Sequence, residues 1–594
     1  MGHTKKLITI MTKAKGKPIS KKSKQSTKVT ESKISVWLEH NFKTLSYSIL
    51  GLAFLLRLWL LIQLPNMPFS EMHQNPDLDM NFFDVWGDRI AHGDFLTDTV
   101  LHPYHNWHKE AADYLGAKSD EEGRAMWSAW YGGKTYHQEP LYAQILGICK
   151  MLGGNGHMLM YILQILSTLF SIWMIIWLGR HYFGPIAGIS AGLLFSLYSP
   201  AILFDVFLLR TSLTTCYMLS LLFVSEKLMI GKSKPWLFGL LGGLGYLLQS
   251  TAVLLWIPLL IRWLYVRRQD VNRTWQTGIA FAGVLSLLAI RNSIAGVGLF
   301  SVSSVGPVTF ILSNFPNYKP EMGFVFFEQV GKVLQETHGK MLDSVMKIIS
   351  VHPSFFSYIG LEFKKLALVF HWYEVPNNVN SYVPMKLSLP LRFAFVPWSL
   401  IGALGLTGMI FNLRNKKTLN LFFGVLSQAV VMVAFYVLCR FRVPMVAMMA
   451  VFGGFAIQEL IKSASLTRKL LVAGVAIAMW LFMVRPYPKI DVPFPMGELA
   501  IYFHTYYRER MDQSAAEGNL KKGIAYGQQF VSTMPNFIKH IEEHLPLETS
   551  NQKDLARYYG NVHGDLGDFY RDDGQKQEAD RCYRIMDRLL KAAE

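Results

Sequence analysis

Charged residues and cysteines are both scarce in this chain of 594 residues. Charged side chains make up 17% of the sequence, whereas soluble globular proteins carry roughly a quarter. Over such a length, this deficit excludes a purely soluble enzyme, a disordered chain and a fibrous protein. The four cysteines are too few and too widely spaced for a disulfide framework or a zinc cluster. With 51% hydrophobic residues, the composition indicates a membrane protein that crosses the bilayer several times.

Positive charge is concentrated at the N-terminus. Residues 1–45 contain eleven lysines and two glutamates, and so contribute +9 of the formal net charge of +17. This segment lacks an apolar core of its own, so we predict a basic cytoplasmic tail rather than a cleaved signal peptide. The rest of the chain is close to neutral for its size, and nucleic acid is therefore not an expected partner.

Long apolar runs follow the basic tail. A spanning helix needs roughly 20 mostly apolar residues, and on this basis we expect about eleven spans in an all-α polytopic membrane protein. The expected spans are 46–64, 157–178, 185–203, 211–229, a pair within 236–265 divided at Gln249, 275–296, 395–413, 420–439, 444–461 and 470–484. Lysines and arginines after alternate spans predict a cytoplasmic N-terminus and an extracytoplasmic C-terminus.

Two long segments between the spans, 65–156 and 297–394, are predicted to be extracytoplasmic loops. The first contains a short apolar helix, 141–152, which we expect to lie along the membrane surface. Residues 46–485 would then form one membrane domain. Residues 486–594 are soluble in composition and are predicted to form a helical domain of their own.

The C-terminal domain has a spacing of small and large residues that resembles a tetratricopeptide repeat. The pattern is carried by Leu566-Gly567, Tyr570, Gly574, Ala579 and Tyr583. In such repeats, small and large residues interlock two antiparallel helices. A plain helical hairpin remains the alternative interpretation.

The predicted outer loops contain several acidic residues. Asp77, Asp79 and Asp84 lie in the first loop, Glu139 lies just before the short apolar helix, and Glu374 begins a Glu-Val-Pro-Asn-Asn segment in the second loop. Carboxylates beside a membrane are costly unless they are solvated, paired or functional. A solvated acidic face is the alternative to a catalytic cluster.

Arginines also lie at predicted outer helix ends, where the bias toward cytoplasmic positive charge makes them exceptional. They are Arg210, Arg291, Arg440 and Arg442, and Asn292 follows the second of them. Such arginines can simply anchor helices at the interface. Arginine forks, however, match phosphate oxygens, so arginines beside carboxylates predict a lipid-phosphate substrate at the outer leaflet.

Five short motifs occur in the same order as in a known superfamily. They are Asp79 followed by Phe82-Phe83 and Trp86, then Pro140-Leu141-Tyr142, Arg291-Asn292, Glu374-x-Pro-Asn-Asn378, and Arg440-Phe-Arg442-x-Pro444. Because the five motifs occur in this order across about residues 46–485, the chain resembles the glycosyltransferase C (GT-C) superfamily. More narrowly, it resembles the bacterial dolichyl-phosphate-mannose-protein mannosyltransferase-like branch.

The resemblance implies an inverting transfer of a hexosyl or pentosyl unit from a polyprenyl-phosphate carrier to a protein, glycan or lipid acceptor. The family's general base corresponds to Asp79, with Asp77 as its nearest rival. Arg291, Arg440 and Arg442 would stabilise the leaving phosphate. Glu374 and Asn378 would contact the sugar or close the site.

Four further residues are candidate substrate ligands: Asp84, Arg210, Asn292 and Glu139. Glu139 departs from the residue usual at its position, so it is expected either to bind acceptor hydroxyls or to pair with an arginine. No cofactor or bound metal is expected. The Asp77-x-Asp79 pair nevertheless resembles the Asp-x-Asp of metal-using relatives and leaves Mg²⁺ or Mn²⁺ open.

Other functions predict different sequence features. A transporter or flippase of a lipid-linked sugar would show internal repeats and charges at the membrane centre, and neither is evident. An enzyme that joins whole glycans would have its large loop late in the chain. A non-catalytic scaffold would not need Asp79. We expect a bacterial inner-membrane protein whose active side and C-terminal domain face the periplasm.

Overall fold

The computed structural model describes residues 33–153, 156–321, 327–486, 504–534, 536–547 and 550–594. Most of the predicted basic tail, residues 1–32, therefore lies outside the described residues. Within them, the chain forms helices and no β-strand beyond isolated bridges. The predicted all-helical fold is confirmed.

Six described helices are long and apolar enough to cross a membrane. They are α2 (Phe42–Gln63), α7 (Gly156–Tyr182), α13 (Thr274–Ala295), α21 (Leu419–Ala434, counted with the preceding turn), α22 (Cys439–Lys462) and α23 (Leu466–Met483). A seventh arises if α10 (Thr211–Met229) is joined to the segment Ser199–Val206, from which it is bent by 117°. The chain is thus a multi-pass membrane protein.

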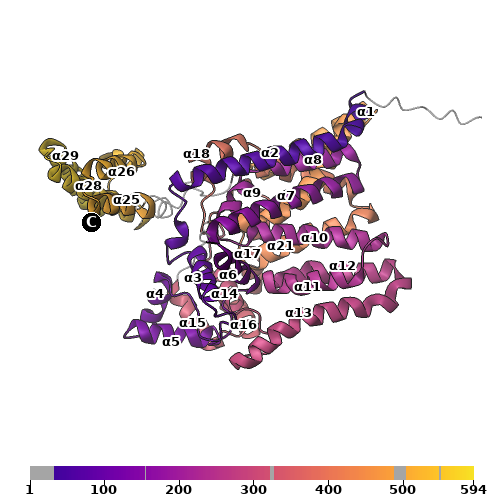
Figure 1. The fold of residues 1–594 in the computed structure, drawn as a ribbon, viewed down its shortest axis with the longest axis horizontal. Helices are drawn as coiled ribbons and strands as arrows, with labels where there is room; N and C mark the ends of the chain where they lie inside the picture. Colours follow the sequence, from indigo (N-terminus) through magenta and orange to yellow (C-terminus); the bar gives the residue numbers. More distant parts are fainter. Residues whose placement is uncertain (1–32, 154–155, 322–326, 487–503, 535, 548–549) are drawn as a thin grey trace, which may run out of the picture.

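The predicted number of eleven spans is not confirmed, because several of the predicted spans form shorter helices. These are α8 (Pro185–Ser196), α11 (Pro235–Leu248), α12 (Val253–Val266) and α20 (Trp398–Asn412). The breaks have local causes. Pro200, which has no backbone N–H to continue α8, lies in the first turn of the next short helix, Ser199–Leu203. Gln249 has an extended backbone that ends α11. Figure 1 shows that α8, α11 and α12 still run alongside α7 and α10.

Helix α22 lies at the centre of the bundle, packed against α8, α10, α20 and α21. Its residues Met445–Phe452 are all fully buried. Side-chain atoms added at Gly454 or at Gly408 of α20 would collide with backbone carbonyls of neighbouring helices. Such backbone-to-backbone contact is typical of membrane helices. It fixes the position of the first turn of α22, which carries Arg440 and Arg442.

The two predicted loops gather at one end of the bundle, which we call the loop side (left in Figure 1). The first loop forms η2 (Met72–Gln74), α3 (Asp79–Ala91), α4 (Asn106–Tyr114), α5 (Asp120–Trp130) and α6 (Leu141–Leu152). The second forms α14 (Val305–Asn314), α15 (Phe327–Thr337), α16 (Met341–Val351), α17 (Phe355–Val369), α18 (Tyr382–Leu387) and α19 (Leu389–Phe393). Helix α15 packs on α4, so the two loops form one joint layer with its own apolar core.

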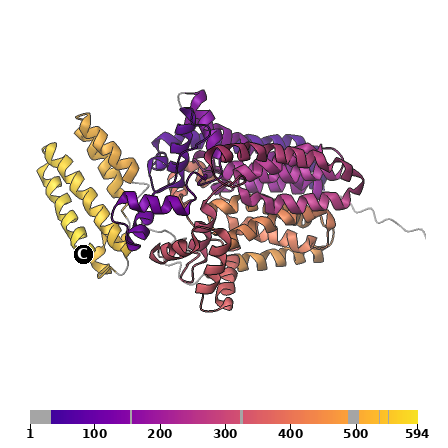
Figure 2. The same cartoon turned by 90° about the horizontal axis from the view of Figure 1, so that it is seen from below.

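The C-terminal helices form a separate group on the loop side (Figures 1 and 2). They are α25 (Glu509–Ala516), α26 (Leu520–Ser532), α27 (Asn536–Lys539), α28 (Ser550–Asp572) and α29 (Lys576–Ala593). Contacts of Glu71 and Val383 are among those that join them to the rest of the described chain. Arg510 donates to both carboxylate oxygens of Glu71, at 3.0 and 2.9 Å, and Val383 of α18 belongs to their apolar core. Their assignment as a tetratricopeptide pair stays a prediction.

Candidate active site

Asp79 lies at the first residue of α3, where the positive end of the helix dipole favours a carboxylate. Its backbone N–H donates to Asn378 Oδ1 at 2.7 Å, and Asn378 Nδ2 donates to Asp79 Oδ2 at 2.9 Å. Asn378 adopts a left-handed backbone with φ of 57°, which asparagine tolerates better than most residues. Gln138 Nε2 donates to Asp79 Oδ1 at 3.3 Å. The two loops therefore meet at Asp79.

Arg440 adds a positive charge to this group. Its Nη2 lies 2.7 Å from Asp79 Oδ2. Burial raises the pKa of the Asp79 carboxyl, but the charge and hydrogen bond of Arg440 outweigh burial and hold the pKa below its ordinary value of 3.8. The Asp79 side chain is therefore a carboxylate at neutral pH, in the state that can accept a proton.

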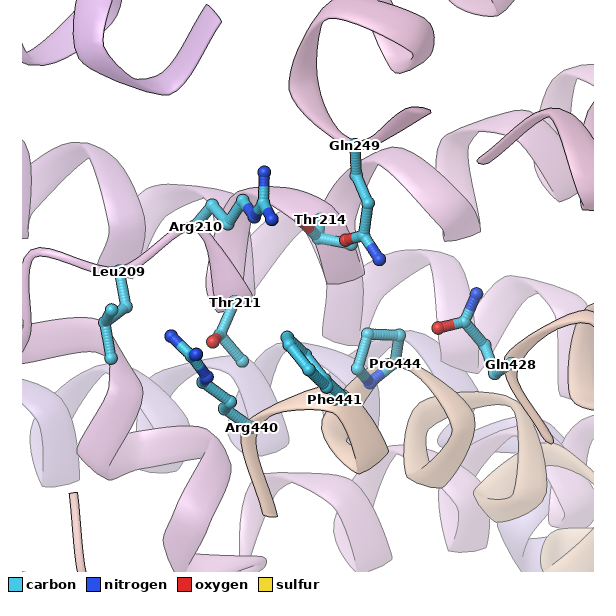
Figure 3. A pocket seen from close by; sticks show the side chains of 9 residues that line it. All are labelled: Leu209, Arg210, Thr211, Thr214, Gln249, Gln428, Arg440, Phe441 and Pro444. Carbon is cyan, nitrogen blue, oxygen red and sulfur yellow. The ribbon is translucent and has the colours of Figure 1, made fainter. Parts of the chain in front are cut away.

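A small cavity lies beside this ion pair, between α10, α21, α22 and the turn after α11. Figure 3 shows its lining. The lining residues are Leu209, Arg210, Thr211, Thr214, Gln249, Gln428, Arg440, Phe441 and Pro444. Among the described atoms, Arg440 Nε and Thr214 Oγ1 are buried without a hydrogen-bond partner. Leaving buried polar atoms without a hydrogen bond costs free energy. Hydrogen bonds to these two atoms would therefore stabilise a polar ligand in the cavity.

Arg210 is the second arginine of the cavity and is paired with Glu139. Its Nη1 contacts Glu139 Oε2 and donates to the Leu248 carbonyl at 3.2 Å. The other oxygen, Glu139 Oε1, accepts from the Ser250 backbone N–H at 2.9 Å and from its hydroxyl at 2.7 Å. Burial raises the pKa of Glu139, but Arg210 and Ser250 outweigh burial and lower it below the usual value. Of the two roles expected for Glu139, this geometry matches pairing with an arginine.

Arg442 and Glu374 form a buried ion pair away from the cavity lining. Arg442 Nη1 lies 2.6 Å from Glu374 Oε2 and donates to the Tyr373 carbonyl at 3.0 Å. The hydroxyl of Tyr198 donates to Glu374 Oε1 at 2.6 Å. Arg442 therefore does not line the cavity that contains Arg440 and Arg210. Instead, the pair binds the segment that carries Asn378 to the start of α22, which carries Arg440.

Arg291 and Asn292 are also absent from the lining of this cavity. The Arg291 guanidinium donates to the backbone carbonyls of Leu96 at 2.9 Å, Lys134 at 2.9 Å and Thr97. Asn292 Nδ2 donates to the carbonyls of Gly298, Leu299 and Ser301. Because these donors bind backbone, both side chains hold the end of α13 to the loops rather than lining the cavity.

Asp77 and Asp84 do not join Asp79. The Asp77 carboxylate accepts from the backbone N–H of Asn106 at 3.1 Å and from its side chain at 3.0 Å, at the start of α4. Asp84 lies five residues after Asp79, which turns it to another face of α3. There it contacts Lys150 at 2.6 Å and His157 at 2.5 Å. The two carboxylates of the Asp-x-Asp pair therefore have different partners.

Several residues of the cavity and its surroundings were not among the predicted site residues. They are Thr211, Thr214, Gln249, Gln428 and Phe441, together with Gln138 beside Asp79. Polar residues inside apolar runs are a known mark of functional positions in membranes. That signal could have selected Gln249 and Gln428.

Part of the chain is similar in sequence to a known protein family. Residues 137–293 match the family model for dolichyl-phosphate-mannose-protein mannosyltransferases. The match begins beside Glu139, which pairs with Arg210, and ends just after Arg291 and Asn292. No curated protein sequence matches the chain.

One solved structure is similar in outline: the oligosaccharyltransferase of Archaeoglobus fulgidus, tethered to an acceptor peptide. It is 12% identical in sequence, with a TM-score of 0.35. The alignment covers 80% of this chain and 59% of that one. The chain thus spans less than two thirds of the length of that structure.

The apolar helices show a multi-pass membrane protein. Part of its sequence is similar to a mannosyltransferase family, as the ordered motifs predicted, and that similarity covers residues 137–293, about a quarter of the chain.

Proposed function

We propose that this protein transfers a single hexosyl or pentosyl unit from a polyprenyl-phosphate carrier to an acceptor on the loop side, with inversion at the anomeric carbon. One observation carries the proposal. The Asp79 carboxylate lies 2.7 Å from Arg440, and Arg440 shares a polar cavity with a second arginine, Arg210. A proton acceptor and a phosphate-binding pair thus lie side by side.

In the proposed reaction, the acceptor hydroxyl gives its proton to the Asp79 carboxylate. The hydroxyl oxygen forms a bond to the anomeric carbon while the bond from that carbon to the phosphate oxygen breaks. The negative charge gained by the leaving polyprenyl phosphate is stabilised by Arg440 and Arg210. General base catalysis contributes about 10²–10⁴-fold to such a rate.

The acceptor is a protein, a glycan or a lipid, and the lipid bilayer supplies the carrier. We propose that Asp79 acts without a metal, so adding Mg²⁺ or Mn²⁺ to the purified protein should leave the rate unchanged. The protein would work in a bacterial inner membrane, with the N-terminus in the cytoplasm. The loop side and the C-terminal helices would then face outward.

The test is transfer by the purified protein of a labelled sugar from a synthetic polyprenyl-phosphate sugar, with Arg440→Lys as the diagnostic variant. Lysine keeps the positive charge but loses the planar fork that binds two oxygens at once. We expect kcat to fall about 10²–10³-fold, as when one preorganised donor is lost. The matched control is Arg392→Lys, an exposed arginine of α19, which should keep the wild-type rate.

Two outcomes would contradict the proposal. Equal rates for Arg440→Lys and wild type would show that the Arg440 guanidinium is not needed to bind the phosphate. Movement of the intact carrier across proteoliposome membranes, without release of its sugar, would instead favour a flippase.

The pH dependence should reflect the lowered pKa of Asp79. Because the charged form is favoured in the folded protein, its stabilising contribution is present above the ordinary pKa of 3.8 and is lost as the pH falls through the lowered value. The acidic limb of kcat/KM that belongs to Asp79 should therefore lie below pH 3.8. In Arg440→Gln the neighbouring charge is gone, so this limb should move to higher pH. An unmoved limb would show that Arg440 does not control Asp79.

A further inference from the structure

A second cluster of ligating side chains lies on another face of α3. It consists of His73 in η2, Asp84 in α3 and His157 in the first turn of α7. One donor atom from each side chain lies within 4.8 Å of the other two. The two imidazole rings meet edge to face, with centroids 4.5 Å apart. The proposed transfer reaction uses none of the three residues.

The donor atoms of this cluster favour Zn²⁺ over Mg²⁺ and Ca²⁺. Two imidazoles and one carboxylate match the three protein ligands of many zinc sites, with a fourth position left for water. Mg²⁺ and Ca²⁺ prefer oxygen ligands alone. Ligands around tetrahedral zinc are separated by roughly 3.3 Å, which follows from bond lengths near 2.0–2.1 Å. Small side-chain rotations would bring the three donor atoms to that spacing, with the 2.5 Å His157–Asp84 contact opening and the wider separations closing.

Lys150 is the one cation next to this cluster among the described contacts, and its position decides whether a metal can enter. Its Nζ lies 2.6 Å from Asp84 Oδ1, 2.6 Å from Asp88 Oδ1 and 3.1 Å from the Asp84 carbonyl. The described contacts of the Asp84 carboxylate, from Lys150 and from His157, both use Oδ1. Oδ2 can therefore face a metal while Lys150 stays on Oδ1 and Asp88. A hydrogen-bonded ligating carboxylate is the usual arrangement at metal sites.

The geometry points to a Zn²⁺ site formed by His73, Asp84 and His157, with water as the fourth ligand. The site joins three segments that are distant in sequence: the turn before α3, α3 itself and the start of α7. His73 lies two residues after Glu71, which holds Arg510 of α25 with two hydrogen bonds. The metal thus fixes the segment on which the C-terminal helices dock.

The test is metal content and thermal stability of the full-length, tag-free protein in detergent. After dialysis against Zn²⁺ and removal of the excess, wild type should retain one Zn²⁺ per chain, and His73→Ala and His157→Ala should retain none. Zn²⁺ should raise the Tm of wild type but not of either variant. The matched control is His92→Ala, which removes an exposed histidine at the end of α3 and should behave as wild type.

Asp84→Asn provides an independent check, because it keeps the side-chain shape while weakening the third ligand. It should bind Zn²⁺ more weakly than wild type and still elute as a monodisperse species. The site is overturned if wild type retains no Zn²⁺, if His73→Ala and His157→Ala retain as much as wild type, or if Mg²⁺ gives the same rise in Tm. In each case the cluster is only an ion pair between Asp84, His157 and Lys150.

Discussion

Replacing Asp79 by asparagine should lower kcat at least about 100-fold, because the variant lacks a proton acceptor and the loss of a general base typically costs this much. Asparagine has nearly the same shape as aspartate. Its side-chain oxygen can still accept from Asn378 and Arg440, which contact the carboxylate at 2.9 and 2.7 Å. The loops should therefore stay joined, and the loss should fall on the chemical step. Single-turnover transfer from a labelled polyprenyl-phosphate sugar measures that step directly.

Two matched substitutions make this experiment decisive. Asp77→Asn changes the nearest rival, whose carboxylate binds Asn106 at the start of α4, and it should keep a rate close to wild type. Asp113→Asn changes an exposed carboxylate of the same loop and serves as the control for folding. If Asp77→Asn loses activity while Asp79→Asn keeps it, the base is assigned to the wrong residue. If both keep full activity, neither carboxylate is the base.

The sequence placed Asp79, Asn378 and Arg440 in three separate motifs, and the structure brings them into contact. This was predictable because each motif borders a helix end that the hydropathy pattern puts on one side of the membrane. Asp79 starts α3, Arg440 lies in the first turn of α22, and Asn378 lies in the long segment between spans. Residues at the same end of a helical bundle are confined to a small region. The order of the motifs and their shared end of the bundle therefore predict that they lie close together.

The sequence could not separate arginines that line the cavity from arginines that bind backbone. Arg291 and Arg440 were both selected because they lie at helix ends predicted to be extracytoplasmic. Arg291, however, donates to three backbone carbonyls, whereas Arg440 contacts Asp79. That difference depends on side-chain direction and on loop segments distant in sequence, which no local pattern encodes. Helix lengths were equally hard to predict, because the ends of α8 and α11 are set by single residues within apolar runs.

Replacing Arg442 by methionine should destabilise the protein by about 3–5 kcal/mol, the usual cost of removing one partner from a buried ion pair. Both side chains of the Arg442–Glu374 pair are nearly or fully buried, at 0% and 7% exposed. Without the guanidinium, the Glu374 carboxylate would stay buried beside the neutral Tyr198 hydroxyl and Cys439 thiol, having lost the positive charge that compensates it. Unfolding in detergent, followed by intrinsic fluorescence, measures the loss.

The double variant Arg442→Met, Glu374→Gln distinguishes a structural role from phosphate binding. If the cost of Arg442→Met comes from the charge left on Glu374, removing that charge should restore much of the stability. Arg440→Met should show the opposite pattern, with activity lost and stability nearly kept, because its partner Asp79 is partly exposed and retains Asn378. If Arg442→Met instead raised KM for the carrier without lowering stability, Arg442 would bind substrate. The structural role assigned to Arg442 would then be wrong.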